Sequence, residues 1–162
     1  MIRFSIDDSS VVDWRVSIDS SDRLLSVPGV ISDLKIVKNS CNELNELNLS
    51  RFDNLRSFEV ESNALKSVKN LTMNGLNELK SIEIENGSLN GVEKVGIGSD
   101  SLNSLSSFNF TSLSSVRRIE IGSKSMNSVV NVTANRLSML ENVRIEDESC
   151  LLYTSPSPRD RI

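Results

Sequence analysis

Residues that could carry out catalysis are scarce in this chain. The sequence contains no histidine, which excludes Ser-His-Asp and Cys-His catalysis and the usual zinc sites. The stretch Val95-Gly-Ile-Gly-Ser-Asp-Ser101 lacks the third glycine, the lysine and the following helix of a phosphate-binding loop. Carboxylates occur in pairs, but these pairs recur at a regular interval along the chain. We therefore expect no enzyme, no catalytic residues, and no cofactor or metal site.

An internal repeat organises the chain and must position any binding surface. Leu79-Lys-Ser-Ile82-Glu-Ile84 repeats Leu55-Arg-Ser-Phe58-Glu-Val60 after 24 positions. One such unit cannot bury its apolar side chains alone, so the copies must stack into a solenoid. Short strands are expected at Leu34, Leu47, Phe58, Leu71, Ile82, Val95, Phe108, Ile119, Val132 and Val143.

The spacing of these strands predicts how they are arranged. Intervals of 13 and 11 residues alternate, except that Ile82 to Val95 and Val95 to Phe108 are both 13. A whole coil contains two strands and two crossings, which require more residues than this at about 3.3 Å per residue. Each interval is therefore half a coil, and successive strands should alternate between two sheets. The prediction is a mainly β solenoid of about five 24-residue coils, with two short parallel sheets and little helix.

The periodic apolar residues should form an aliphatic core, since aromatic residues make up only 4% of the chain. The expected core includes Leu55, Phe58, Val60, Leu71, Ile82, Ile84, Phe108, Ile119 and Ile121. Cys41 takes the repeat position of Leu65 and is expected to be a small core residue. At the polar corner, small residues should stack in one register: Ser40, Ala64, Ser88, Ser101, Ser125 and Ser149. A polar binding track is the alternative interpretation of this column.

Two segments carry a resemblance to a known family. Met73-Asn-Gly-Leu76-Asn-Glu-Leu79-Lys-Ser-Ile82-Glu-Ile84 and Phe110-Thr-Ser-Leu113-Ser-Ser-Val116-Arg-Arg-Ile119-Glu-Ile121 resemble the LxxLxL frame of leucine-rich repeat proteins. They are similar to its BspA-like branch, close to FxxCxxLxxVxI, with Leu or Val in place of Cys and without the AF dipeptide. The resemblance covers about residues 24 to 149 and implies a leucine-rich-repeat-like solenoid. Such repeats serve many binding roles. The abundance of Ser and Asn resembles expanded repeat families of microbial eukaryotes.

Both ends of the chain depart from the repeat. Residues 1–22 alternate apolar and polar positions and are expected to be an N-terminal cap, with Trp14 as its lid; a fragment of an upstream domain is the alternative. Residues 23–149 are expected to form the solenoid, as a truncated fragment, with the repeat frame beginning at Arg23 and Leu25 aligned with Leu49. The tail from Cys150 resembles translated sequencing-adapter read-through, so residues 150–162 are expected to be non-native and disordered. A genuine Pro-rich linker is the alternative.

Charge and hydrophobicity restrict the classes of partner. The net charge of −4 argues against nucleic acid, which requires a basic face. No apolar run approaches the roughly 20 residues that span a bilayer, so no membrane partner is expected within this fragment. The first residues lack the apolar region of a secretory signal. The sequence makes no prediction of cellular location.

Outward-facing positions of the strands supply the candidate binding face. In a strand, the residue between two inward apolar side chains faces solvent. Five glutamates follow this rule or come two residues later: Glu59, Glu61, Glu83, Glu85 and Glu120. They could form a patch for a basic protein partner. A solvated face that keeps sheet edges soluble is the competing interpretation.

The alternation of strands bears on this acidic set. It should place Glu59 and Glu83 in one sheet with Asn109 and Thr133, and Glu120 and Arg144 in the other with Asn48 and Thr72. The set would then be divided between two faces.

The expected function is a non-catalytic protein- or ligand-binding repeat scaffold. The alternative is a structural spacer segment of a longer repeat array or surface protein, with no ligand of its own.

Overall fold

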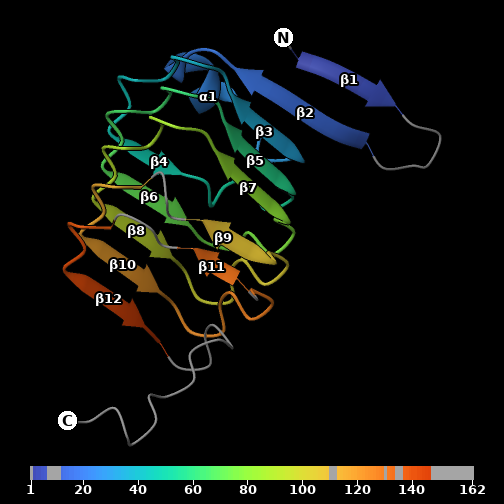
Figure 1. Ribbon diagram of the computed structural model, residues 1–162. Coiled ribbons are helices and arrows are strands. Elements are labelled where there is room, and N and C mark those ends of the chain that lie inside the picture. Colours follow the sequence, from blue (N-terminus) through green and yellow to red (C-terminus); the bar gives the residue numbers. More distant parts are fainter. Residues whose placement is uncertain (1, 7–11, 110–112, 130, 134–136, 147–162) are drawn as a thin grey trace, which may run out of the picture.

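Each strand that the repeat predicts is present in the computed structural model, which describes residues 2–6, 12–109, 113–129, 131–133 and 137–146. The chain is a mainly β solenoid of about four turns of about 24 residues, with very little helix (Figure 1). Its elements are β1 (Ile2–Ile6), β2 (Val12–Ile18), α1 (Ser21–Ser26), β3 (Asp33–Ile36), β4 (Glu46–Asn48), β5 (Ser57–Val60), β6 (Asn70–Met73), β7 (Ser81–Ile84), β8 (Lys94–Ile97), β9 (Ser107–Asn109), β10 (Arg118–Ile121), β11 (Asn131–Thr133) and β12 (Asn142–Ile145).

Successive strands lie on opposite sides of the solenoid, as the 13- and 11-residue intervals predict. Sheet A has the order β1-β2-β3-β5-β7, and sheet B has the order β12-β10-β8-β6-β4. Val95 pairs with Leu71 and Ile119 within sheet B, and Ile82 pairs with Phe58 within sheet A. The neighbours within both sheets are parallel, apart from the antiparallel pair of β1 and β2. The predicted alternation of half-coils is confirmed.

The expectation of two sheets needs one correction, because a third sheet is present. Strands β9 and β11 form their own two-stranded sheet, sheet C, on the same side of the solenoid as sheet A (Figure 1). Ile82 and Phe108 are 26 residues apart, whereas paired strands in sheets A and B lie 24 residues apart from β3 onward. The two consecutive 13-residue half-coils displace β9 from the register of β7. Thr133 and the backbone of Asn109 therefore lie in sheet C, not in the sheet of Glu59 and Glu83.

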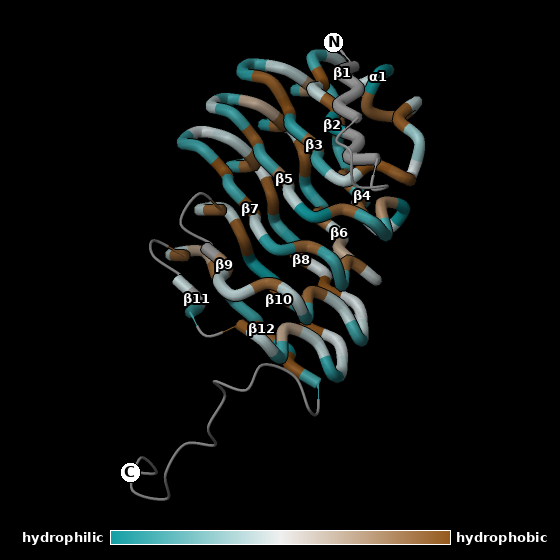
Figure 2. The backbone as a smooth tube through the Cα atoms, turned by 90° about the vertical axis from the view of Figure 1, so that its right-hand side faces the viewer, coloured by the Kyte–Doolittle hydropathy of each residue, from teal (hydrophilic) through white to brown (hydrophobic). Residues whose placement is uncertain are grey.

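The interior is filled by the periodic apolar residues. Figure 2 shows hydrophobic stretches recurring along the backbone of successive coils. Most of the predicted core is buried: Leu55, Phe58, Val60, Leu71, Phe108, Ile119 and Ile121. Ile82 and Ile84 pack against this core but stay partly exposed, because they lie where sheet A gives way to sheet C. Cys41 is a buried core residue, as expected, and burial raises the pKa of its thiol.

The small residues of the polar corner form two columns, which corrects the prediction of one. Ser40, Ala64 and Ser88 follow strands of sheet A, whereas Ser101 and Ser125 follow strands of sheet B. The 13-residue crossing changes sides at β8, and the corner moves with it. The flanking residues have positive φ, as at Asn63 (61°) and Leu65 (55°). Ser149 lies outside the described residues.

The serine hydroxyls hold successive corners together. Ser88 Oγ accepts a hydrogen bond from the Ala64 N–H at 3.2 Å and donates to the Glu61 carbonyl at 2.6 Å. Ser125 Oγ accepts from the Ser101 N–H at 3.1 Å in the same way on the other side. Their burial is therefore structural, because each satisfies backbone groups that the turn leaves unpaired.

The N-terminal end differs from the prediction that the repeat frame begins at Arg23. Helix α1 occupies this segment, and Asp22 in its first turn favours a helical start. Leu25, expected to match the buried Leu49, is 64% exposed. Arg51 from the next coil donates to the carbonyls of Leu24 and Leu25 at the end of the helix.

Two expectations lie outside the described part of the chain. The side chain of Trp14 is not described, although the backbone of β2 pairs with both β1 and β3. The tail of residues 150–162 is not described either.

Candidate functional site

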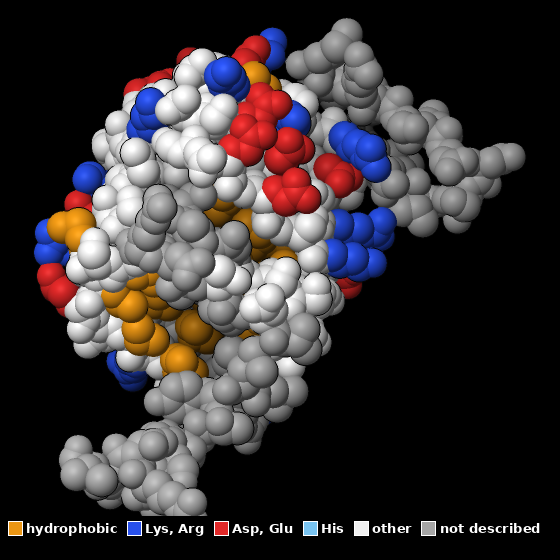
Figure 3. Space-filling model, in the orientation of Figure 1, with side chains coloured by type: hydrophobic (Ala, Val, Ile, Leu, Met, Phe, Trp, Pro, Cys, Tyr) orange, Lys and Arg blue, Asp and Glu red, His pale blue; other side chains and the backbone are white. Residues whose placement is uncertain are grey.

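The outer face of sheet A brings together four of the five predicted glutamates. Glu59 and Glu83 are directly paired in β5 and β7, and Lys35 pairs with Glu59 from β3. Glu61 and Glu85 follow one residue after the ends of β5 and β7. Figure 3 shows acidic side chains gathered over the part of the molecule where β3, β5 and β7 lie. One lysine and four glutamates make this group acidic.

Lys35 is bound by two of these carboxylates. Its Nζ lies 2.7 Å from Glu59 Oε1 and 2.7 Å from Glu61 Oε1. The hydrogen bonds to Glu59 and then to Glu61 raise the pKa of Lys35 well above its usual value. The hydrogen bond from Lys35, followed by the one from the Lys38 backbone, lowers the pKa of Glu61. Both carboxylates are therefore already engaged within the protein.

Glu61 and Glu85 also bind the backbone of the preceding coil. Glu61 Oε2 accepts a hydrogen bond from the Lys38 N–H at 2.8 Å, and Glu85 Oε2 accepts one from the Ser62 N–H at 2.9 Å. Glu146 repeats this contact on sheet B with the Ser123 N–H at 3.3 Å. These glutamates therefore have a structural role in addition to contributing negative charge to the face.

Glu83 is the member of the group that is most open to a partner. It is exposed on β7 and has no ion-pair partner among the residues that the structure describes. Glu85 uses one carboxylate oxygen to accept the Ser62 N–H, and Lys35 is bound to Glu59 and Glu61. The negative charges of Glu83 and Glu85 are therefore not compensated by Lys35. This charge lies at the end of sheet A next to sheet C.

Glu120 does not lie on this face, so the five predicted glutamates do not form one patch. It belongs to β10 in sheet B, where its register partners are Gly96 and Arg144. Lys94 Nζ lies 2.7 Å from Glu120 Oε2, and this hydrogen bond lowers the pKa of Glu120. Sheet B thus carries Glu120 as half of an ion pair. The predicted division of the acidic set between two faces is confirmed.

Ion pairs between coils also occur beside sheet B. Lys69 Nζ lies 3.0 Å from Glu93 Oε1, and Arg117 Nη1 lies 2.7 Å from Glu141 Oε1. The two partners of each pair are 24 residues apart, so they are neighbours in successive coils. Opposite charges alternate down this column, which leaves it without a surplus of either sign.

Two basic residues on the side of sheet A were missed by the sequence analysis. Arg56 and Lys80 directly precede β5 and β7 and are exposed. Their backbone N–H groups bond to the Ser32 carbonyl (2.7 Å) and the Arg56 carbonyl (2.9 Å), so they stack in successive coils. Their 24-residue spacing in the sequence was the signal that could have found them.

Small residues lie between the basic and the acidic positions. Ser57 and Ser81 face outward from β5 and β7, and the Ser81 hydroxyl donates to Ser57 Oγ at 3.2 Å. In sequence, each of the two coils therefore reads basic, serine, acidic, acidic; the serine and the glutamates face outward from sheet A, and the basic residue directly precedes the strand. The charges are separated along the strand direction, with the basic residues at the strand starts and the acidic residues at the strand ends.

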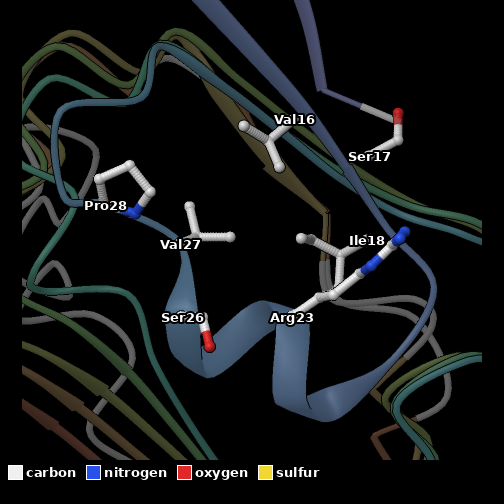
Figure 4. A pocket seen from close by; sticks show the side chains of 7 residues that line it. All are labelled: Val16, Ser17, Ile18, Arg23, Ser26, Val27 and Pro28. Carbon is white, nitrogen blue, oxygen red and sulfur yellow. The ribbon is translucent and has the colours of Figure 1, made fainter.

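Shallow pockets lie on both sheet faces and at the N-terminal end. The hollow on sheet A measures about 340 Å³ and is lined in part by Asp33, Lys35, Ser57 and Glu59. A polar hollow of about 330 Å³ on sheet B lies over β4, β6 and β8. The N-terminal pocket of about 380 Å³ is more apolar, and Val16, Ile18 and Val27 are among the residues that line it (Figure 4).

No match was found for this chain among protein-family models, curated proteins or solved structures. Within the described ranges, His, Cys, Asp and Glu side chains do not form a group of three or more that could hold a metal ion. The described part of the chain also contains no helix long and apolar enough to cross a membrane.

Proposed function

We propose that this protein is a non-catalytic binding scaffold that uses the outer face of sheet A to bind a protein partner with basic side chains. The observation that supports the proposal is the exposed Glu83 on β7, which pairs with Glu59 in the register of sheet A and lies two residues before Glu85. A rigid sheet presents such side chains at fixed spacing, so a partner meets a preorganised surface. Glu120 is not part of this surface.

Leucine-rich repeat membership, in the BspA-like branch, is part of the proposal. The LxxLxL frame predicts a strand at its second and third apolar positions. In the segment that begins at Leu79, these positions are Ile82 and Ile84, and both lie in β7. Binding across several coils is the usual mode of solenoid proteins. An origin in a microbial eukaryote remains a hypothesis from composition.

Titration with a short lysine-rich peptide tests the proposed face. The full chain should bind it at low ionic strength by isothermal titration calorimetry, and salt should weaken the binding. The variant Glu83→Gln should weaken binding at least about threefold. Glu120→Gln is the matched control, because it removes one carboxylate from sheet B. Equal losses in both variants would contradict the proposal, as would equal binding of an acidic peptide.

A structural spacer is the second candidate, and a separate observation favours it. Glu61 and Glu85 accept backbone N–H groups of the coil before them, so part of the acidic pattern serves to join coils. A spacer needs this stability and no exposed recognition surface. It would show neither peptide binding nor any effect of Glu83→Gln.

A further inference from the structure

Three Asn-Gly sequences occur in the chain, and the asparagine of each is exposed. They are Asn74-Gly75, Asn86-Gly87 and Asn90-Gly91. In such a sequence the backbone nitrogen of the glycine can attack the asparagine side chain, because glycine has no Cβ to obstruct the approach. The attack requires a glycine N–H that is not engaged elsewhere and a backbone that can rotate. The three sites differ in both respects.

The site at Asn74 is held by hydrogen bonds and by packing. The Gly75 N–H donates to Ser101 Oγ at 2.7 Å, and the Asn74 N–H donates to Ser50 Oγ at 3.1 Å. A Cβ at Gly98 would lie 2.3 Å from Asn74 Oδ1, so the amide of Asn74 is packed closely on that glycine. The attacking nitrogen is therefore engaged, and the side chain that it must reach is fixed.

The site at Asn90 is held through its backbone. A Cβ at Gly91 would lie 2.3 Å from the Lys66 carbonyl oxygen and 3.3 Å from the Val68 carbonyl oxygen. Gly91 is therefore pressed against the main chain of the preceding coil. Rotation of this peptide would displace backbone atoms in a closely packed part of the solenoid.

The site at Asn86 has neither restraint. The Ser88 N–H donates to the Glu85 carbonyl at 3.3 Å, and this bond closes the turn without using the Gly87 N–H. Neither the Asn86 side chain nor the Gly87 N–H has a hydrogen-bond partner among the described residues. A Cβ at Gly87 would lie 2.7 Å from Asn63 Oδ1, which is the end of a side chain and not a backbone atom. The peptide between Asn86 and Gly87 can therefore rotate at the smallest cost.

We propose that Asn86 is a site of spontaneous deamidation, and that the carboxylate so formed adds to the acidic end of sheet A. The Gly87 nitrogen attacks Asn86 Cγ, and a new N–Cγ bond closes a five-membered imide. The Cγ–Nδ2 bond breaks, and ammonia leaves with the former Gly87 amide proton. Water then opens the imide, at Cγ to give aspartate or at the main-chain carbonyl carbon to give isoaspartate. In total, one amide and one water become one carboxylate and one ammonium ion.

The product changes the charge of the face described above. Asn86 directly follows Glu85, so the new carboxylate joins Glu83 and Glu85, whose charges Lys35 does not compensate. The location of the reaction is independent of the proposed function, and only its effect on a partner rests on that function. The added charge should strengthen binding of the lysine-rich peptide about twofold at low ionic strength.

Incubation of the full chain in mildly alkaline buffer, followed by tryptic digestion and tandem mass spectrometry, tests the site. Asn86 and Asn90 share the tryptic peptide 81–94, and fragmentation assigns the mass increase to one of them. Asn86 should react at least about threefold faster than Asn74 or Asn90, where a hydrogen bond or a backbone contact must open first. In urea the three rates should converge, because unfolding removes these contacts.

Two variants complete the experiment. Asn86→Ser is the matched control, since the preceding coil carries Ser62 at the equivalent position, 24 residues earlier. It should abolish the rapid mass increase of peptide 81–94. Asn86→Asp supplies the aspartate product directly for titration with the lysine-rich peptide. Circular dichroism confirms that both variants are folded.

The outcomes separate this inference from the proposed function. Equal rates at the three sites of the folded chain overturn the proposed site, as does a preference for Asn86 that persists in urea. An unchanged peptide affinity of Asn86→Asp, while Glu83→Gln still weakens binding, retains the proposed function and overturns the added charge on the binding face. Selective reaction at Asn86 in a chain that binds no peptide supports the deamidation site and overturns the proposed function.

Discussion

Replacing Phe58 with alanine should remove a large part of the stability of this solenoid. Phe58 is 1% exposed and lies in β5 of sheet A, paired with Leu34 on one side and Ile82 on the other. Losing its transfer energy costs about 1.5–3 kcal/mol. The hydrogen-bonded coils on both sides restrict collapse, so a residual cavity adds to the loss. The total is about 3–5 kcal/mol.

Urea denaturation followed by circular dichroism measures this loss. For a chain of this size the midpoint of thermal unfolding should fall by about 6–20 °C. Val143→Ala is a useful control, because Val143 occupies an inward repeat position in β12 but is 50% exposed. That change should cost only about 1 kcal/mol. A loss below about 1 kcal/mol for Phe58→Ala would place Phe58 outside the core and refute the repeat register.

Two further predictions concern the backbone and pH. Gly91→Ala should destabilise the fold by about 1–3 kcal/mol in urea denaturation, because the new Cβ would lie 2.3 Å from the Lys66 carbonyl oxygen. Gly96→Ala is the control and should be neutral or slightly stabilising, because a Cβ at Gly96 has nothing within 4 Å. Equal effects of the two substitutions would contradict the close approach at Gly91. The lowered pKa of Glu61 means that its contribution to stability is present above the usual value of 4.5 and is lost as pH falls through the folded-state value. Unfolding midpoints measured from about pH 6 to about pH 3 should therefore fall less in Glu61→Gln than in the wild type, and parallel curves would refute this role.

The fold was predictable from spacing because the repeat acts at every level. The apolar residue at Phe58 recurs after 24 positions in the sequence and pairs in space with the residue at that interval. The number of residues between successive strands also predicted the sheet to which each strand belongs. An interval of 13 residues is too short for a whole coil, so successive strands must lie in opposite sheets. Glu83 and Glu120 consequently lie on different sheets, although their local sequences look alike.

Other features depended on contacts that spacing does not encode. Helix α1 is held by Arg51, which binds the carbonyls at its C-terminal end from the next coil. The corner at Ser101 is similar in sequence to the corner at Ser88. However, Ser88 follows a strand of sheet A and Ser101 follows a strand of sheet B, because the 13-residue half-coil comes after the sheet B strand from β8 onward. The basic residues Arg56 and Lys80 were not predicted, because they directly precede β5 and β7, where the alternation of a strand assigns no face.

The structural use of glutamate limits which carboxylates can serve recognition. A glutamate that accepts a backbone N–H of the preceding coil, as Glu61 and Glu85 do, is favoured by selection for stability alone. Glu83 accepts no such bond from the described residues, and it is exposed on β7. Its charge has two candidate explanations outside the coil: it keeps the end of sheet A at β7 soluble, or it meets a basic side chain on a partner. For this reason Glu83, and not the acidic set as a whole, is the residue on which the binding proposal depends.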